Sequence, residues 1–248
     1  MIVLLDFDDT LSEFDSFIEQ FTSTLATLLT DKLGGSIEEW NRKVLNMMIA
    51  VENDYIQHFI QNPLAGYRQW LPTSYQLASE FLFDSTIPLK KREKVRLLKR
   101  VRKQALLSVN ACFPGMIQLV KDLHSNNVQL VMASGNDSEH LNHALKAAGI
   151  LNCFSKVYGP DLIDCAKEGP EYYARICDAL SITPDQAVVV DNDAVALGWA
   201  ADVGMKTVHL KILSRSDDLN KPLDSTSITA PEAVMEAIRN QMGSHFNQ

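Results

Sequence analysis

The chain opens with a short apolar run that stops abruptly at a group of acidic residues. Residues 2–5 are continuously apolar, and Asp6, Asp8 and Asp9 follow immediately. A continuous apolar run of this length is typical of a parallel strand that is covered on both faces. The pattern therefore predicts a buried strand with three carboxylates at its carboxyl end.

Roughly a hundred residues after this strand show helical periodicity. Apolar side chains recur at three- and four-residue steps, and Gly34, Pro63 and Pro88 interrupt the pattern. Helices are predicted over about residues 14–33, 36–62, 74–83 and 89–108, with a loop around residues 66–72. Ser36 and Glu39 form a capping box at the start of the second helix. We expect these helices to form a cap over residues 13–112.

Strands and helices alternate regularly in the remainder of the chain. Apolar strand patterns occupy residues 128–133, 156–158, 187–190 and 206–210. Helical patterns occupy residues 116–125, 138–148, 170–180, 194–202 and 231–241. This alternation is typical of βαβ units, so we predict a doubly wound, Rossmann-like parallel sheet. Residues 1–12 and 113–248 would form this α/β core.

Composition narrows the function classes. The chain is 46% hydrophobic, and its formal net charge of −8 argues against general binding to nucleic acid or membrane surfaces. No apolar run approaches a membrane span, and Asp6 interrupts the N-terminal run, which argues against a signal peptide. The four cysteines show no CxxC spacing and suggest reduced thiols in a cytoplasmic protein. Composition does not determine the oligomeric state.

Positive charge is concentrated in one predicted helix. Nine of the 23 basic residues lie between Lys90 and Lys103, opposed only by Glu93. This face could steer an anionic substrate or bind an acidic partner. The alternative is a solvated helix face, with apolar side chains packing inward from the opposite side.

Polar side chains end three of the predicted strands. Asp6 and Asp8 follow the first, Ser134 the second and Asp191 the strand at 187–190. Ligands bind at the carboxyl edge of such sheets, where these groups would meet. Carboxylate oxygens together with a phosphate oxygen suit Mg²⁺ rather than zinc. Lys167 lies just before the predicted helix at residues 170–180. Together, these carboxylates, the Ser134 hydroxyl and the lysine ammonium are the groups that phosphoryl transfer needs.

The order of these groups resembles the haloacid dehalogenase-like superfamily, whose members are mostly phosphatases. The first motif matches Asp6, Asp8 and Thr10, and the second matches Ser134 with Gly135. The third motif matches Lys167, followed by a proline and an aromatic residue. The fourth matches Asp191, Asn192 and Asp193. A helical cap inserted after the first motif also agrees with the family.

The resemblance implies a role for each matched residue. Asp6 would attack phosphorus, and Asp8 would serve as general acid and base. Asp6, the Asp8 carbonyl and Asp191 would hold Mg²⁺, while Ser134, Gly135 and Lys167 would bind the phosphoryl oxygens. Thr10 would support the turn.

One departure concerns the fourth motif. Family members often carry a second acid beside or shortly after the aspartate, whereas this chain has Asn192 beside it. Asn192 or Asp193 would then support the metal.

Specificity is expected to lie in the cap. Tyr67, Arg68 and Trp70 lie in the predicted loop, and together with basic residues of the fourth helix they would suit a polar, anionic substrate. The alternative for these residues is hinge packing.

The leading hypothesis is a Mg²⁺-dependent hydrolase of a small phosphorylated metabolite, acting through an aspartyl-phosphate. A dehalogenase is less favoured, because Asp8 supplies an acid/base that carbon–halogen displacement does not need. A phosphomutase on the same core and a non-catalytic binding protein remain as alternatives.

Overall fold

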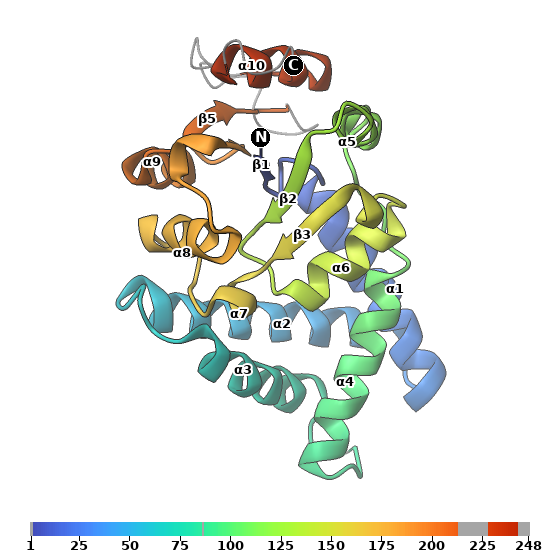
Figure 1. The fold of residues 1–248 in the computed structure, drawn as a ribbon. Helices are drawn as coiled ribbons and strands as arrows, with labels where there is room; N and C mark the ends of the chain where they lie inside the picture. Colours follow the sequence, from blue (N-terminus) through green and yellow to red (C-terminus); the bar gives the residue numbers. More distant parts are fainter. Residues whose placement is uncertain (1, 86, 213–227, 243–248) are drawn as a thin grey trace, which may run out of the picture.

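The computed structural model describes residues 2–85, 87–212 and 228–242, and the described strands form one parallel sheet. Its order is β3-β2-β1-β4-β5 (Figure 1), with β1 at the centre. The strands are β1 Ile2–Leu5, β2 Gln129–Ala133, β3 Phe154–Tyr158, β4 Ala187–Asp191 and β5 Lys206–His209. The prediction of a doubly wound parallel sheet is confirmed.

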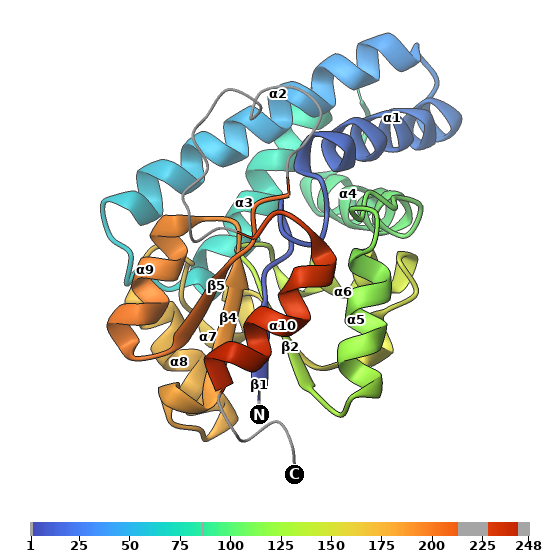
Figure 2. The same cartoon turned by 90° about the horizontal axis from the view of Figure 1, so that it is seen from above.

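Helices cover both faces of the sheet, which explains why β1 is apolar at every position. Val3 and Leu5 pack on the side of α5, α6 and α10, whereas Ile2 and Leu4 pack on the side of α8 and α9 (Figure 2). These helices span Met116–Ser125, Ser138–Ala147, Pro231–Met242, Pro170–Leu180 and Ala194–Val203, in the order named. Short helical turns η2 Leu151–Cys153, α7 Pro160–Ile163 and η3 Pro184–Gln186 join the elements.

The segment between β1 and α5 is a helical cap over the carboxyl ends of the strands (Figure 1). It contains α1 Phe14–Leu33, α2 Ile37–Tyr55, the π-helix η1 Ile56–Ile60, α3 Tyr67–Leu82 and α4 Lys91–Leu106. The Ser36 hydroxyl accepts a hydrogen bond from the Glu39 amide at 3.1 Å, as the capping box predicts. None of the described helices is both long and apolar enough to cross a membrane.

The predicted loop around residues 66–72 is wrong, because α3 already begins at Tyr67. Pro72 lies inside this helix, where its missing amide argues against helix on sequence grounds. Tyr67 and Trp70 are buried against Phe59 and Ala166, which favours helix from the first turn. Tertiary packing thus outweighs the local signal. The sequence also predicts a frayed segment over residues 243–248, which lie outside the described residues.

The basic helix α4 mostly has the solvated face that the alternative interpretation describes. Leu98, Val101 and Ala105 are buried, and most of its basic side chains are exposed. Arg102 departs from this pattern, since its guanidinium reaches the α6 side of the core and binds Asp137 at 2.7 Å.

A buried tyrosine fixes the ends of two strands. The Tyr172 hydroxyl on α8 donates to the Ser134 carbonyl at 2.9 Å and lies 3.3 Å from the Tyr158 carbonyl. We expect Tyr172→Phe to lower the free energy of unfolding by about 1–3 kcal/mol, because it leaves the buried Ser134 carbonyl without this donor. Urea unfolding measures the change. Tyr158→Phe is the matched control, and a Tyr172→Phe protein as stable as that control would contradict the assignment.

Candidate active site

Parallel register places Asp6 beside Asp191. Leu5 pairs with Val190 of β4 on one side and with Met132 of β2 on the other. The next residue, Asp6, donates its backbone amide to the Val190 carbonyl at 3.0 Å. Asp6 and Asp191 are therefore level at the carboxyl ends of adjacent strands, where α/β sheets bind ligands.

Lys167 joins these two carboxylates. Its ammonium lies 2.7 Å from an oxygen of Asp6 and 2.7 Å from an oxygen of Asp191. All three side chains are at most one-tenth exposed. Lys167 comes from the loop between α7 and α8. It is 161 residues from Asp6 and 24 residues from Asp191 in the sequence, so three separate segments meet at one point. The predicted convergence of Asp6, Lys167 and Asp191 is what the structure shows.

The chain turns sharply after Asp6 and thereby separates the two motif-one acids. Asp9 adopts the left-handed conformation with φ of 53°, which aspartate tolerates better than most residues. The amides of Leu11 and Ser12 then donate to the Phe7 carbonyl and close the turn. The Asp8 carboxylate accepts a hydrogen bond from the Asn136 side chain at 2.6 Å.

Burial raises the pKa of both acids. Burial raises the pKa of Asp6 to about 7, and the neighbouring Lys167 ammonium opposes this rise. Burial likewise raises the pKa of Asp8 to about 6, and the hydrogen bond from Asn136 opposes it. Asp8 can therefore exchange a proton near neutral pH, as a general acid and base must.

The remaining first- and fourth-motif residues support the loops. The Thr10 hydroxyl donates to the Asn192 side-chain oxygen and accepts from the Asn192 amide, both at 3.0 Å. The Asp193 amide donates to Asp191, and the Asp193 carboxylate accepts from the Val195 amide at the start of α9. Asp193 therefore caps a helix, which is a structural contact that its position in the motif does not reveal.

These side chains surround a cavity of about 350 Å³. Ser134 and Gly135 line it together with Asp6, Asp8 and Lys167. Asp191, Asn192 and Asp193 complete its far side. Within the described ranges, no group of three or more His, Cys, Asp or Glu residues is arranged to hold a metal by itself. Of the aspartates that line this cavity, Asp6 and Asp191 are the pair that shares Lys167.

A second cavity of about 360 Å³ lies between this site and the cap. Tyr67 and Trp70 line it, whereas Arg68 lines neither cavity. The Arg68 guanidinium instead donates to the carbonyls of Asp161 and Leu162, which join the cap to α7.

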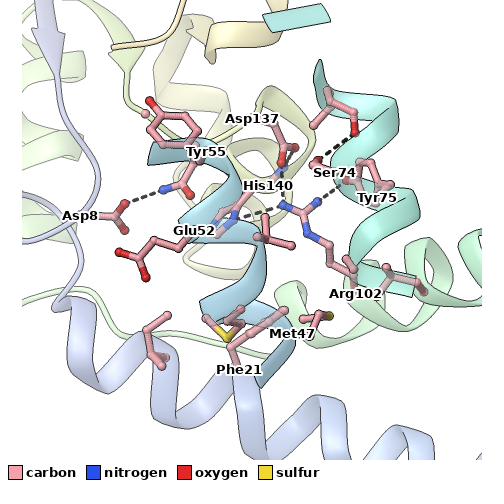
Figure 3. A pocket seen from close by; sticks show the side chains of 18 of the residues that line it. Asp8, Phe21, Met47, Glu52, Tyr55, Ser74, Tyr75, Arg102, Asp137 and His140 are labelled. Carbon is pink, nitrogen blue, oxygen red and sulfur yellow. Dashed lines mark hydrogen bonds and ion pairs between the residues drawn. The ribbon is translucent and has the colours of Figure 1, made fainter. Parts of the chain in front are cut away.

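Sequence reasoning missed a polar cluster in this second cavity. The Arg102 guanidinium binds Asp137 at 2.7 Å and the Tyr75 hydroxyl at 2.8 Å, with His140 Nδ1 3.4 Å away (Figure 3). In the sequence Arg102 is indistinguishable from its eight basic neighbours. Asp137 carries a recognisable signal only as the N-cap of α6, where it accepts from the His140 amide.

Comparison with known proteins identifies the family. The sequence profile of the haloacid dehalogenase-like hydrolases matches residues 1–204. The chain belongs to this hydrolase family. The (S)-2-haloacid dehalogenase 4A of Burkholderia cepacia is 26% identical over 100 residues, covering 40% of this chain and 43% of that enzyme. Validoxylamine A 7'-phosphate phosphatase of Streptomyces hygroscopicus subsp. limoneus is 30% identical over 116 residues, covering 44% and 54%.

Similarity to solved structures of the same fold covers almost the whole chain. A crystal structure of a HAD phosphatase from Thermococcus onnurineus matches with a TM-score of 0.57 at 20% identity, covering 96% of this chain and 97% of that one. The regions aligned with the curated relatives span only about half of their length. The relatives include both dehalogenases and phosphatases. Family membership therefore identifies a hydrolase, but it does not distinguish between these two reactions.

Replacement of Lys167 tests the buried ion cluster. We expect Lys167→Met to lower the free energy of unfolding at pH 7 by about 3–5 kcal/mol, because Asp6 and Asp191 then face each other without the shared cation. Urea unfolding in the absence of divalent cations measures this loss. Lys121→Met, at an exposed position, is the control and should change stability by less than about 0.5 kcal/mol. Equal stability of the two variants would contradict the cluster's role.

His140 predicts a loss of stability in acid. Burial, together with the Arg102 cation, lowers the pKa of His140 to about 3, whereas the unfolded residue titrates near 6.5. Between these values the unfolded chain binds an extra proton, so stability falls as the pH falls through this window. His140→Phe keeps a ring against Phe17, and we expect it to reduce the slope by up to about 1.4 kcal/mol per pH unit.

The slope is measured by urea unfolding at several pH values between 6.5 and 4. His124→Gln, at an exposed position, serves as the control for removing a histidine. An unchanged slope in His140→Phe would refute the assignment of a neutral buried histidine.

Proposed function

We propose that this hydrolase cleaves phosphate monoesters of a small metabolite through an aspartyl-phosphate intermediate. The observation that carries the proposal is the second carboxyl group of the first motif. Asp8 is held by Asn136 at 2.6 Å on the same cavity as Asp6, and its pKa is raised to about 6. Displacement of halide from carbon needs a nucleophile but no acid for the leaving group, so this second carboxyl favours phosphoryl chemistry.

Two half-reactions follow from the roles of these acids. In the first, a carboxylate oxygen of Asp6 bonds to phosphorus as the bond to the ester oxygen breaks, and Asp8 gives that oxygen a proton. In the second, Asp8 takes a proton from water as the water oxygen bonds to phosphorus. The bond to Asp6 then breaks, inorganic phosphate leaves, and both acids return to their starting states.

Ser134, Gly135 and Lys167 are proposed to hold the phosphoryl oxygens. Ser134 and Gly135 lie at the end of β2, facing the same cavity as the acids. The Lys167 ammonium favours the ionised form of Asp6, which the attack requires, and adds positive charge for the phosphoryl group. Tyr173 lies 3.5 Å from Asp191 and helps to keep that carboxylate in place.

The donor set fits Mg²⁺. The ion usually keeps several waters and binds through one or two carboxylates together with substrate phosphate, rather than through a complete protein cage. Asp6 and Asp191 supply two such carboxylates, and the Asp8 backbone carbonyl is the proposed third ligand. When bound, the ion would neutralise charge on the phosphoryl oxygens. Asn192 and Asp193 are proposed as outer supports through the Thr10 and Asp191 contacts.

We further assign residues 13–112 to the cap and residues 1–12 with 113–248 to the catalytic core. In support, the backbone enters the cap after Ser12 and returns beside it, where Ser12 forms an isolated bridge with Cys112. Tyr67 and Trp70 are proposed as substrate contacts, because both line the second cavity.

Activity of three variants tests the proposal. With an aryl phosphate and Mg²⁺, we expect Asp6→Asn to lose at least about 10³-fold in kcat and Asp8→Asn about 10²–10⁴-fold. Asp15→Asn, at an exposed position on α1, should stay within about twofold of the wild-type protein. Chelation should abolish phosphate release, and added Mg²⁺ should restore it.

Halide release from a 2-haloacid by the wild-type protein, without phosphate release from any ester, would refute the proposal. Phosphate release that survives in Asp6→Asn would refute the nucleophile assignment alone.

A further inference from the structure

The two cavities adjoin at the general acid. Asp8, Phe14 and Gly135 line both the 350 Å³ cavity around Lys167 and the 360 Å³ cavity beneath the cap. If phosphorus is held in the first cavity near Asp6, the ester oxygen that Asp8 protonates lies where the first cavity meets the second cavity. The second cavity is therefore the place for the alcohol part of the ester, and its size lies at the small end of the range of about 300–1,000 Å³ for small-molecule sites.

The walls of the second cavity are mostly apolar and aromatic. They come from α1, α2 and α3, which enclose it from the cap side (Figure 3). The apolar side chains include Phe17, Phe21, Met47, Val51, Trp70 and Tyr75. Such walls stabilise an apolar group by burial and an aromatic ring by further edge and face contacts.

The charged groups of this cavity leave no cation for a second anion. Arg102 is the one lysine or arginine among the described residues that line it, and Asp137 binds its guanidinium at 2.7 Å. The neighbouring His140 ring is neutral at physiological pH, because burial lowers its pKa to about 3. Asp8 and Glu52 lie together on the opposite side from Arg102 (Figure 3). The cavity therefore carries net negative charge.

We propose that the alcohol part of the substrate is uncharged and largely apolar, so that the phosphoryl group is the substrate's single anionic group. This inference rests on the proposed phosphatase activity. A carboxylate or a second phosphate in the cavity would lose its hydration, meet Glu52 and Asp137, and find its only cationic partner already engaged. The polar, anionic substrate expected from Arg68 is not retained, since that guanidinium is bound to carbonyls outside the cavity.

Three esters of similar leaving-group acidity test the proposal. Benzyl phosphate carries an apolar ring that the small ester ethyl phosphate lacks, and para-carboxybenzyl phosphate adds a single carboxylate to that ring. We expect kcat/KM for benzyl phosphate to exceed the values for both other esters by at least about tenfold. Equal or faster turnover of para-carboxybenzyl phosphate or of ethyl phosphate would overturn the inference and leave the phosphatase assignment standing. Absence of phosphate release from all three would overturn both.

Charge reversal at Glu52 tests the electrostatic part. Glu52 is an exposed residue of α2, so its replacement should not disturb the core. We expect Glu52→Lys to raise the ratio of kcat/KM for para-carboxybenzyl phosphate over benzyl phosphate by at least about fivefold. Glu38→Lys makes the same charge change on the same helix outside the cavity, and it should move the ratio by less than about twofold. Equal effects of the two variants would contradict a local role for Glu52.

Discussion

The ammonium of Lys167 between Asp6 and Asp191 is the interaction on which the site depends. Two carboxylates at the ends of adjacent strands repel each other in a buried setting, and burial alone would favour their protonated forms. One cation 2.7 Å from each offsets this repulsion and holds the two side chains close together. It also fixes the loop between α7 and α8 to the centre of the sheet. The contact therefore joins three distant segments into one centre, where the proposed nucleophile Asp6 lies.

The same arrangement explains how two aspartates two residues apart serve different ends. Asp6 continues β1 and faces Lys167, whereas the turn at Asp9 brings Asp8 to Asn136. Asp6 lies beside a cation and Asp8 beside a neutral amide, so the two acids meet different partners although burial raises the pKa of both. Asp8 also borders both cavities, which places a proton where the phosphoryl group and its alcohol would separate.

A second ion pair, between Arg102 and Asp137, links the cap to the core. Arg102 crosses from the cap to the N-cap aspartate of α6 and touches Tyr75 on the way. Arg68 adds a further link to carbonyls near α7, and Tyr55 adds one to Glu168, the residue after Lys167. These contacts hold cap and core together while neutralising the basic charge nearest the cavity. Among the described residues that line the second cavity, the paired Arg102 is the one lysine or arginine, which is the basis for the proposed uncharged leaving group.

The sequence by itself determined the sheet, the order of its motifs and most helix bounds. The α8 bounds, for example, agree fully, because a glycine and a proline start it and apolar side chains recur regularly along it. The identities of Asp6, Lys167 and Asp191 also followed from the chain, since strand ends in a parallel sheet share one edge. Only the tertiary structure decided that α3 starts at Tyr67 and that Arg102 turns inward to Asp137 while most of its basic neighbours are exposed. Each of these depends on a partner far away in sequence, and local patterns carry no information about such partners.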